Sequence, residues 1–379
     1  MYNHMKIAIY GISLNESSNV KRFMKVANEA DLILIADTGS TDNTVELLKQ
    51  HDVEVHSIKI APFRFDNARN TALALVPDEY DCLISLDLDE LIEPQTGWRK
   101  AVEKKWRGDT NRLNYLFIHK HKPNGSPEII FKANKIHNKQ FKWVYPVHEV
   151  LSHINKDVKI KSKDLDSTQF QVHHWKDPLK DRENYLPLLE LSVKENPLDD
   201  RCIHYLAREY YTQKIWGKAI KLFQKHLLTS TWKAERAASM RFIAHCYVNL
   251  ENINLAEVWF LRACAEDPNK RENWIDLASF YFGIVFYEGC YAAAHRALRI
   301  PIAKRNFEHY LSDEYSWNEG PFDLLAISAW NLGYQEEAKD NIQKAVQLAP
   351  DDERIKKNAH LILKTYQNSI KHRDNKINL

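Results

Sequence analysis

The chain has 379 residues, 44% of them hydrophobic and 27% charged, and a formal net charge of +2. This length allows two or three domains, each with its own hydrophobic core. A net charge so close to zero disfavours nucleic acid and anionic membrane surfaces as partners on electrostatic grounds.

Cysteine usage and hydropathy indicate the compartment. The five cysteines are odd in number, show no CxxC spacing and mostly lie inside apolar periodic segments. This pattern favours buried, reduced thiols over a disulfide framework. The first residues lack the apolar region of a signal peptide, and the chain has no apolar run of about 18 residues or more. These features predict a cytoplasmic protein without a membrane span.

The first hundred residues alternate between strand and helix patterns. Short apolar runs predict strands, and apolar residues at helical spacing predict helices. In chain order these are a strand at Lys6–Ile12, a helix around Val20–Ala27, a strand at Asp31–Ala36, a helix at Val45–Gln50, a strand at Val53–Ile60, a helix at Asn67–Ala74 and a strand at Cys82–Leu86. This order predicts a parallel sheet whose ligands bind at the carboxyl ends of its strands.

Acidic residues follow the last of these strands. If the extended backbone continues, Asp87 and Asp89 point to one face, while Leu86 and Leu88 face the core. Two converging carboxylates repel each other unless a cation lies between them, and oxygen ligands suit Mg²⁺ or Mn²⁺. The alternative is a solvated acidic turn that closes the strand.

Residues 110–175 change to a basic, β-rich pattern. Tyr115–His119, Glu128–Ala133 and Lys142–Tyr145 are predicted as short strands. Six lysines lie between residues 120 and 142. They form either a solvated face or a surface that attracts phosphate or an anionic acceptor.

Three motifs in this order resemble glycosyltransferase family 2, whose members have the GT-A fold and use nucleotide-sugar donors. The motifs are Asp-Thr-Gly-Ser-Thr-Asp-Asn-Thr at 37–44, Ala68-Arg69-Asn70, and Ser-Leu-Asp-Leu-Asp-Glu at 85–90. Ser13-Leu14-Asn15-Glu16 corresponds to the first loop of that family. The resemblance covers roughly residues 5–175 and implies an α/β, GT-A nucleotide-sugar-binding domain with a mixed, mainly parallel sheet.

The resemblance also implies a donor site. The residues expected to hold the nucleobase and ribose are Ser13, Asn15, Glu16 and Asp37, with Asp87 also contacting the ribose, and Arg69 is expected near the diphosphate. Two simpler interpretations stay open, namely that Asp37 is a turn or helix-capping residue and that Arg69 is a surface arginine.

The metal site and the general base are implied in the same way. The predicted metal ligands, for Mn²⁺ or Mg²⁺, are Asp87, Asp89 and one of His173 or His174, with His148 as a further alternative. The acidic residue after the later strands acts as general base in the family, and here Glu149 occupies that position. Asp87 and Glu149 are thus the predicted catalytic residues. The chain has His148-Glu149 where the commonest family pattern has Glu-Asp.

Beyond Pro178 the pattern is helical and resembles tetratricopeptide repeats, in which small and aromatic residues recur where two helices pack together. The recurring positions are Ala207, Tyr210, Ala219 and Phe223, then Ala244, Tyr247, Ala256, Phe260 and Pro268, then Ala278, Tyr281, Cys290 and Ala294, and finally Ala326, Ala338, Ala345 and Pro350. We expect an entering helix at Arg182–Glu195, an insertion around Pro301–Pro321 and a capping helix at Glu353–Lys371.

The sequence therefore predicts a GT-A domain at 1–178 and an all-α repeat domain at 179–379. The predicted function is metal-dependent, inverting transfer of a sugar from a nucleotide sugar, a UDP-sugar foremost, to a peptide, saccharide or other polymeric acceptor. The repeats would hold that acceptor or mediate a homodimer. Two alternatives are a non-catalytic repeat scaffold on a decayed transferase domain and a nucleotidyltransferase. The latter is disfavoured because Ser13–Ser18 contains no glycine or basic residue.

Overall fold

The computed structural model describes residues 5–175, 185–304 and 312–377, which fall into two compact units. The first unit ends at Pro197 and the second begins at Leu198. The predicted boundary between residues 178 and 179 lies outside the described residues. The helix expected at Arg182–Glu195 is described from Tyr185 to Glu195, as α5, and it groups with the first unit.

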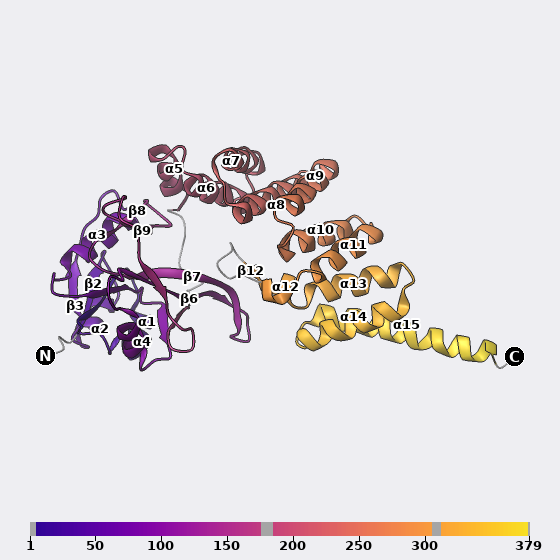
Figure 1. Cartoon of the computed structure of the whole chain (residues 1–379), viewed down its shortest axis with the longest axis horizontal. Helices are drawn as coiled ribbons and strands as arrows, with labels where there is room; N and C mark the ends of the chain where they lie inside the picture. Colours follow the sequence, from indigo (N-terminus) through magenta and orange to yellow (C-terminus); the bar gives the residue numbers. More distant parts are fainter. Residues whose placement is uncertain (1–4, 176–184, 305–311, 378–379) are drawn as a thin grey trace. The chain divides into compact units, whose positions relative to one another are not determined.

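The first unit alternates strands and helices before a β-rich segment (Figure 1). Its strands are β1 Ile7–Ser13, β2 Leu32–Asp37, β3 Glu54–Ser57, β4 Cys82–Ser85, β5 Glu90–Glu93, β6 Arg112–His121, β7 Pro127–His137, β8 Phe141–Val144, β9 Val150–His153, β10 Ser162–Asp164 and β11 Gln171–His174. Its helices are α1 Ser17–Ala27, α2 Thr44–Lys49, α3 Phe65–Leu75, α4 Trp98–Lys105 and α5 Tyr185–Glu195.

The main sheet of this unit is mixed and mostly parallel, as predicted. Its strand order is β3-β2-β1-β4-β7-β6-β11-β5, with β10 beside β6. Strands β1 to β4 run parallel to one another, so the loops that follow β1, β2 and β4 lie at one edge. In that edge Ser13 pairs directly with Asp37. Strands β8 and β9 form a separate antiparallel hairpin.

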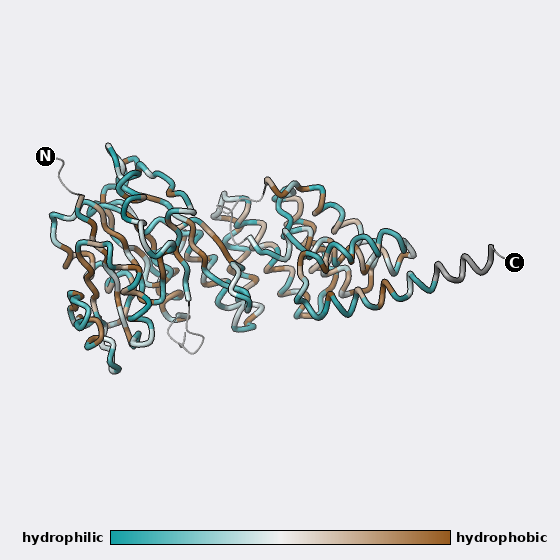
Figure 2. The backbone as a smooth tube through the Cα atoms, turned by 90° about the horizontal axis from the view of Figure 1, so that it is seen from below, coloured by the Kyte–Doolittle hydropathy of each residue, from teal (hydrophilic) through white to brown (hydrophobic). Residues whose placement is uncertain are grey.

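Apolar side chains on both faces of the sheet explain its burial. Ile9 belongs to a core cluster with Phe23 of α1 and Trp98 of α4. The next residue, Tyr10, belongs to a second cluster with Ala72 of α3. Since neighbouring strand residues point to opposite faces, α1 and α4 cover one face and α3 covers the other. Figure 2 shows hydrophobic stretches, in brown, alternating with hydrophilic ones, in teal, along the backbone of this unit.

The second unit consists of helices packed as successive pairs, as predicted. Its elements are α6 Asp200–Thr212, α7 Trp216–Thr229, α8 Lys233–Asn249, α9 Ile253–Glu266, α10 Arg271–Gly283, α11 Tyr287–Leu298, η1 Ile302–Lys304, β12 Ser312–Asp313, α12 Glu314–Trp317, α13 Gly320–Asn331, α14 Gln335–Leu348 and α15 Glu353–Ile377. The repeat positions are inside: Ala207, Ala219, Ala244, Ala256, Ala278, Ala294, Ala326, Ala338 and Ala345 are all fully buried. Part of the predicted insertion, residues 305–311, lies outside the described residues.

All five cysteines are free and buried, as their apolar surroundings predicted. In the described part of the chain, no helix is long and apolar enough to cross a membrane.

A buried chain of hydrogen bonds joins the sheet to the β8–β9 hairpin. Trp143 Nε1 donates to the hydroxyl of Tyr10 at 2.9 Å, and that hydroxyl lies 2.8 Å from Nε2 of His137. Nδ1 of His137 lies 2.7 Å from the carbonyl oxygen of Asn138. A carbonyl oxygen only accepts, so Nδ1 carries the proton and Nε2 accepts from Tyr10. Burial lowers the pKa of His137 to about 4.

We predict that His137 makes folding stability depend on pH. Its pKa is about 4 in the folded chain against an ordinary 6.5, so the unfolded chain binds more protons between these values. The free energy of unfolding should therefore fall as the pH decreases through this window, by up to about 1.4 kcal/mol per pH unit. Urea unfolding of wild type and His137→Gln at several pH values measures the slope. The control is His56→Gln, a partly exposed histidine. An identical slope in wild type and His137→Gln would contradict this assignment.

Candidate active site

Asp37, at the end of β2, organises the loop that follows it. Its carboxylate accepts hydrogen bonds from Ser13 Oγ at 2.9 Å, from Ser40 Oγ at 2.5 Å, and from the amides of Gly39 at 3.0 Å and Ser40 at 2.9 Å. Burial alone raises the pKa of Asp37, but the bonds from Ser40 and Ser13 lower it below its ordinary value. These four bonds match the lone-pair positions of a carboxylate. A contact with a nucleoside would therefore have to replace one of them.

Hydrogen bonds join the loop after β1 to the loop after β2. Asn15 has a positive φ of 53°, and its Oδ1 accepts from the amide of Thr41 at 2.8 Å. The amide of Asn15 donates to Ser40 Oγ at 2.9 Å, and the amide of Glu16 donates to Thr44 Oγ1 at 2.7 Å. The structure thus brings the predicted nucleoside residues together at one edge, with the side-chain oxygen of Asn15 engaged in loop structure.

The segment after β4 differs from the prediction of a continued extended backbone. That prediction is wrong because β4 ends at Ser85 and the chain turns, with the amide of Glu90 donating to the carbonyl oxygen of Asp87 at 2.9 Å. The two carboxylates have different partners. Asp87 pairs with Arg69, and Asp89 pairs with His174.

The position of this turn depends on Gly11 of β1. A Cβ at Gly11 would overlap the carbonyl oxygen of Leu86, so only glycine allows the two backbones to approach. Leu86 and Leu88 are buried, as predicted. The turn is thus anchored by apolar side chains that alternate with its two aspartates.

Arg69 lies at the centre of the site. It is 6% exposed, and its two terminal nitrogens donate to the two oxygens of Asp87 at 2.7 and 2.8 Å. Its Nε donates to Oε1 of Glu149, and the guanidinium lies 5.2 Å from the ring centroid of Trp143. The structure therefore contradicts the interpretation of Arg69 as a surface arginine.

Charge pairing outweighs burial at this arginine. Burial alone lowers the pKa of Arg69, but the carboxylates of Asp87 and Glu149 raise it well above its ordinary value. In the same way, burial raises the pKa of Asp87, yet Arg69 holds it well below its usual range. Arg69 and Asp87 thus remain ionised at neutral pH, and the guanidinium bonds to the carboxylates of Asp87 and Glu149 in one partly buried cluster.

Asn70 fixes the helix that carries Arg69. Its side-chain nitrogen donates to the carbonyl oxygen of Trp143, and its oxygen accepts from the amide of the same residue, both at 2.8 Å. The amide of Phe65 donates to the carbonyl oxygen of Pro146 at 2.9 Å. Helix α3 is thereby held against the hairpin whose connecting loop carries Glu149 (Figure 1). Sequence reasoning used Asn70 only as part of a motif and missed this role.

The two neighbouring histidines of β11 have different partners. His174 Nε2 lies 3.1 Å from Oδ2 of Asp89. His173 instead lies 3.2 Å from Glu93 through Nε2 and 2.9 Å from His121 through Nδ1. Burial alone lowers the pKa of His174, but Asp89 raises it above its ordinary value. The structure brings His174, and not His173, to the acidic turn.

The pair of Asp89 and His174 fits a divalent ion in its donor chemistry. A carboxylate suits Mg²⁺ and Mn²⁺, which also accept phosphate oxygens from a substrate, and an imidazole is a common ligand of divalent transition metals. Asp87 has both carboxylate oxygens bonded to Arg69, so its predicted metal contact stays a prediction. His148 is exposed in the β8–β9 loop, and its ring packs against Tyr185 with centroids 5.9 Å apart.

Two further side chains border the turn: Lys135, which the sequence analysis counted only as one of six lysines, and His119, which it did not single out. Lys135 of β7 donates to Oε1 of Glu90 at 2.5 Å. Glu90 is 3% exposed, and burial raises its pKa although Lys135 opposes this shift. His119 of β6 stacks on His174 with ring centroids 5.3 Å apart. Only the pairing of β4, β6, β7 and β11 brings these residues together, and the sequence contains no local signal of that pairing.

Comparison with known families finds two matches. Residues 12–126 match the glycosyl transferase family 2, and residues 323–352 match the tetratricopeptide repeat. The first unit carries a glycosyltransferase family 2 domain. The family match runs from the end of β1 to the loop after β6 and includes Arg69, Asp87 and Asp89. It supports a glycosyltransferase in general. The second match covers the fourth of the predicted repeats.

Among solved structures, the chain is similar to several helical proteins. They include MamA (14% identity, TM-score 0.35, 43% of this chain and 85% of that chain). YrrB, described as a tetratricopeptide-repeat protein with an unusual peptide-binding site, has 14% identity, a TM-score of 0.37, and coverage of 48% and 84%. TTC0263, a repeat protein of Thermus thermophilus, has 18% identity, a TM-score of 0.35, and coverage of 47% and 88%. No curated protein matched the chain.

We predict that Arg69→Ala strongly destabilises the family 2 domain. It would leave Asp87 and Glu149 as neighbouring carboxylates without their cation, and removing one partner of a buried ion pair costs about 3–5 kcal/mol. The control is Lys161→Ala, because Lys161 pairs with Asp109 at the surface, where the two side chains are 51% and 69% exposed. Its loss should cost far less, because an exposed ion pair contributes little to stability. Urea unfolding measures both, and equal small losses would contradict the burial of the Arg69 cluster.

Proposed function

We propose that the family 2 domain transfers a sugar, with inversion, from a nucleotide sugar to a nucleophile on a polymeric acceptor, and that it requires Mn²⁺ or Mg²⁺. The donor is a UDP-sugar foremost. The observation that carries this proposal is the ion-pair cluster of Arg69, Asp87 and Glu149, next to Asp89 and His174 at the carboxyl edge of the parallel strands. Ligands of such sheets bind at this edge.

Arg69 is suited to the departing diphosphate. A guanidinium has five N–H donors, and three of them bond to Asp87 and Glu149. Two donors therefore remain for phosphate oxygens. Because the carboxylates already fix the guanidinium in one orientation, it needs no reorganisation as negative charge develops on the leaving group.

The metal would be held by Asp89 and His174. A bound Mn²⁺ or Mg²⁺ would supply further neutralisation of the diphosphate charge. Asp37 and Ser13 would order the loop next to the nucleoside, and one of their hydrogen bonds would exchange for a bond to the donor. Asn15 and Glu16, in the loop after β1, would contact the nucleobase and ribose of the donor.

Glu149 is suited to accept the proton of the attacking nucleophile. Arg69 donates to its Oε1, which orients the carboxylate, and its second oxygen can take the proton. The nucleophile is a hydroxyl, thiol or amine. Its attack on the anomeric carbon opposite the leaving diphosphate inverts the configuration of that carbon in a single displacement.

The repeats would hold the acceptor. A tetratricopeptide-repeat region supports binding of a polypeptide, since stacked helix pairs offer an extended surface. We therefore propose a peptide as the first acceptor to test, with saccharides and other polymers next. The homodimer stays a prediction.

We predict that UDP stabilises the chain and that Mn²⁺ increases this effect. A ligand that binds only the folded state raises stability by RT ln(1 + [L]/Kd), about 2.7 kcal/mol at a hundred times Kd. Thermal unfolding with UDP, GDP, ADP and CDP, each with and without Mn²⁺, measures the effect and identifies the base. In Asp89→Asn, the shift with UDP and Mn²⁺ should fall to that seen with UDP alone. No shift with any nucleotide would count against the proposed function.

We predict that Glu149→Gln separates catalysis from donor binding. The nucleotide-dependent thermal shift should remain, because Asp87 still neutralises Arg69. The transfer rate to a hydroxyl acceptor should fall by about 10²–10⁴-fold. A thiol acceptor should show a smaller loss, since its ordinary pKa near 8.5 supplies some thiolate without a base. The matched control is Glu128→Gln, which removes a partly exposed carboxylate paired with Lys120. Wild-type transfer by Glu149→Gln, or loss of nucleotide binding, would exclude Glu149 as the base.

A further inference from the structure

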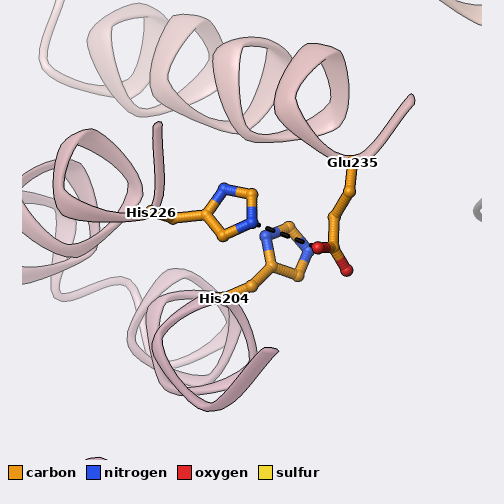
Figure 3. Close-up of side chains that lie close together, drawn as sticks. All are labelled: His204, His226 and Glu235. Carbon is orange, nitrogen blue, oxygen red and sulfur yellow. Dashed lines mark hydrogen bonds and ion pairs between the residues drawn. The ribbon is translucent and has the colours of Figure 1, made fainter. Parts of the chain in front are cut away.

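Two histidines and a glutamate converge inside the second unit. His204 comes from α6, His226 from α7 and Glu235 from the first turn of α8, and both imidazole rings point toward the carboxylate (Figure 3). One potential ligand atom from each lies within 4.8 Å of the other two. Among the described residues searched, no other group of three histidine, cysteine or acidic side chains comes this close.

The cluster is buried, and a buried charge without a partner lowers the free energy of unfolding. His204 and His226 are fully buried, and Glu235 is 5% exposed. His226 Nε2 and Glu235 Oε2 are 3.1 Å apart. Two donors on one tetrahedral zinc ion, with bonds of about 2.0–2.1 Å, lie about 3.3 Å apart. The observed separation is therefore close to that of two ligands of a shared ion.

Ser239 provides a feature typical of metal-binding histidines. It lies one helical turn after Glu235 on α8, and its Oγ is 2.9 Å from Nδ1 of both His204 and His226. A ligating histidine usually donates its second ring N–H to a nearby oxygen, which fixes the ring. A serine oxygen has two lone pairs and can accept from both rings. Each ring would then present Nε2, deprotonated, on the side of the carboxylate.

The electrostatics of His204 agree with a neutral ligand. Burial, followed by the neighbouring His226, lowers the pKa of His204 well below its ordinary value. A histidine binds a metal only in its neutral form. Phe223 and Phe242 pack against the His204 ring, with centroids 5.7 and 6.3 Å away, and so provide an apolar wall.

We propose that His204, His226 and Glu235 bind one divalent transition-metal ion, Zn²⁺ foremost, which links α6, α7 and α8. Imidazole nitrogens and one carboxylate oxygen suit Zn²⁺ better than Mg²⁺ or Ca²⁺, which prefer oxygen ligands throughout. The ion would stabilise the beginning of the repeat region. This site is separate from the donor-site metal, which would be bound in the other unit by Asp89 and His174.

The first test is the metal content of the full chain, purified without a metal-affinity step and analysed by inductively coupled plasma mass spectrometry. We expect roughly one zinc ion per chain, retained in Asp89→Asn and lost in His226→Gln. The control His295→Gln removes a histidine that pairs with Glu337 outside the cluster, and it should keep the zinc. Chelation should lower the melting temperature of wild type, and added Zn²⁺ should restore it.

Ser239→Ala tests the geometry without removing a ligand. Loss of a hydrogen-bond partner behind a ligating histidine weakens metal binding by about 10–100-fold. Ser328→Ala, at another fully buried helical serine, should leave zinc affinity unchanged. Competition with a coloured chelator measures both.

Wild type alone decides the question if a variant fails to fold. Co²⁺ added to the metal-free chain should give the visible d–d absorption of a tetrahedral site, and Zn²⁺ should abolish it. The alternative is a metal-free chain of hydrogen bonds from Glu235 through His226 and Ser239 to His204. Wild type without bound metal, without a response to Zn²⁺ or chelator and without the Co²⁺ spectrum would establish that alternative and overturn the proposal.

Discussion

The candidate active site depends on the ion pairs that the buried guanidinium of Arg69 forms with Asp87 and Glu149. The guanidinium joins Asp87 after β4 to Glu149 after β8, and these segments lie 62 positions apart in the sequence (149 − 87). The arginine pairs with both carboxylates, whose side chains are 25% exposed in Asp87 and 12% exposed in Glu149. One side chain thus sets the positions of the proposed leaving-group site and of the proposed base relative to each other.

The backbone around Arg69 is arranged to keep it there. Asn70, the next residue, forms two hydrogen bonds with the backbone of Trp143, so α3 cannot slide along the hairpin. Trp143 in turn donates to Tyr10 in β1, next to Gly11, whose lack of a Cβ admits the turn that carries Asp87. The positions of the charged groups therefore follow from hydrogen bonds and close packing in the first unit, and this order can exist before any ligand binds.

The sequence predicted those parts of the fold that depend on local pattern. The apolar runs predicted the parallel strands, because a strand that is buried on both faces has apolar residues at successive positions. The alanine spacing gave the helix pairs, because close helices exclude larger side chains. The sequence did not predict side-chain positions that depend on which strands pair and in which register. Whether His173 or His174 faces Asp89 depends on how β11 pairs with β5, and the turn at Asp87 interrupts the period-2 rule. The cluster of His204, His226 and Glu235 is drawn from three helices, so no spacing in the sequence indicates it.

The most direct test of the transferase mechanism is a donor panel. The purified chain is incubated with individual nucleotide sugars and Mn²⁺, with and without a mixture of peptide acceptors, and the release of nucleoside diphosphate is measured. We predict release from one class of donor, UDP-sugars first. This release should stop when the divalent ion is chelated and rise when a suitable acceptor is present. No release from any donor, in a chain that is folded and loaded with Mn²⁺, would contradict that mechanism.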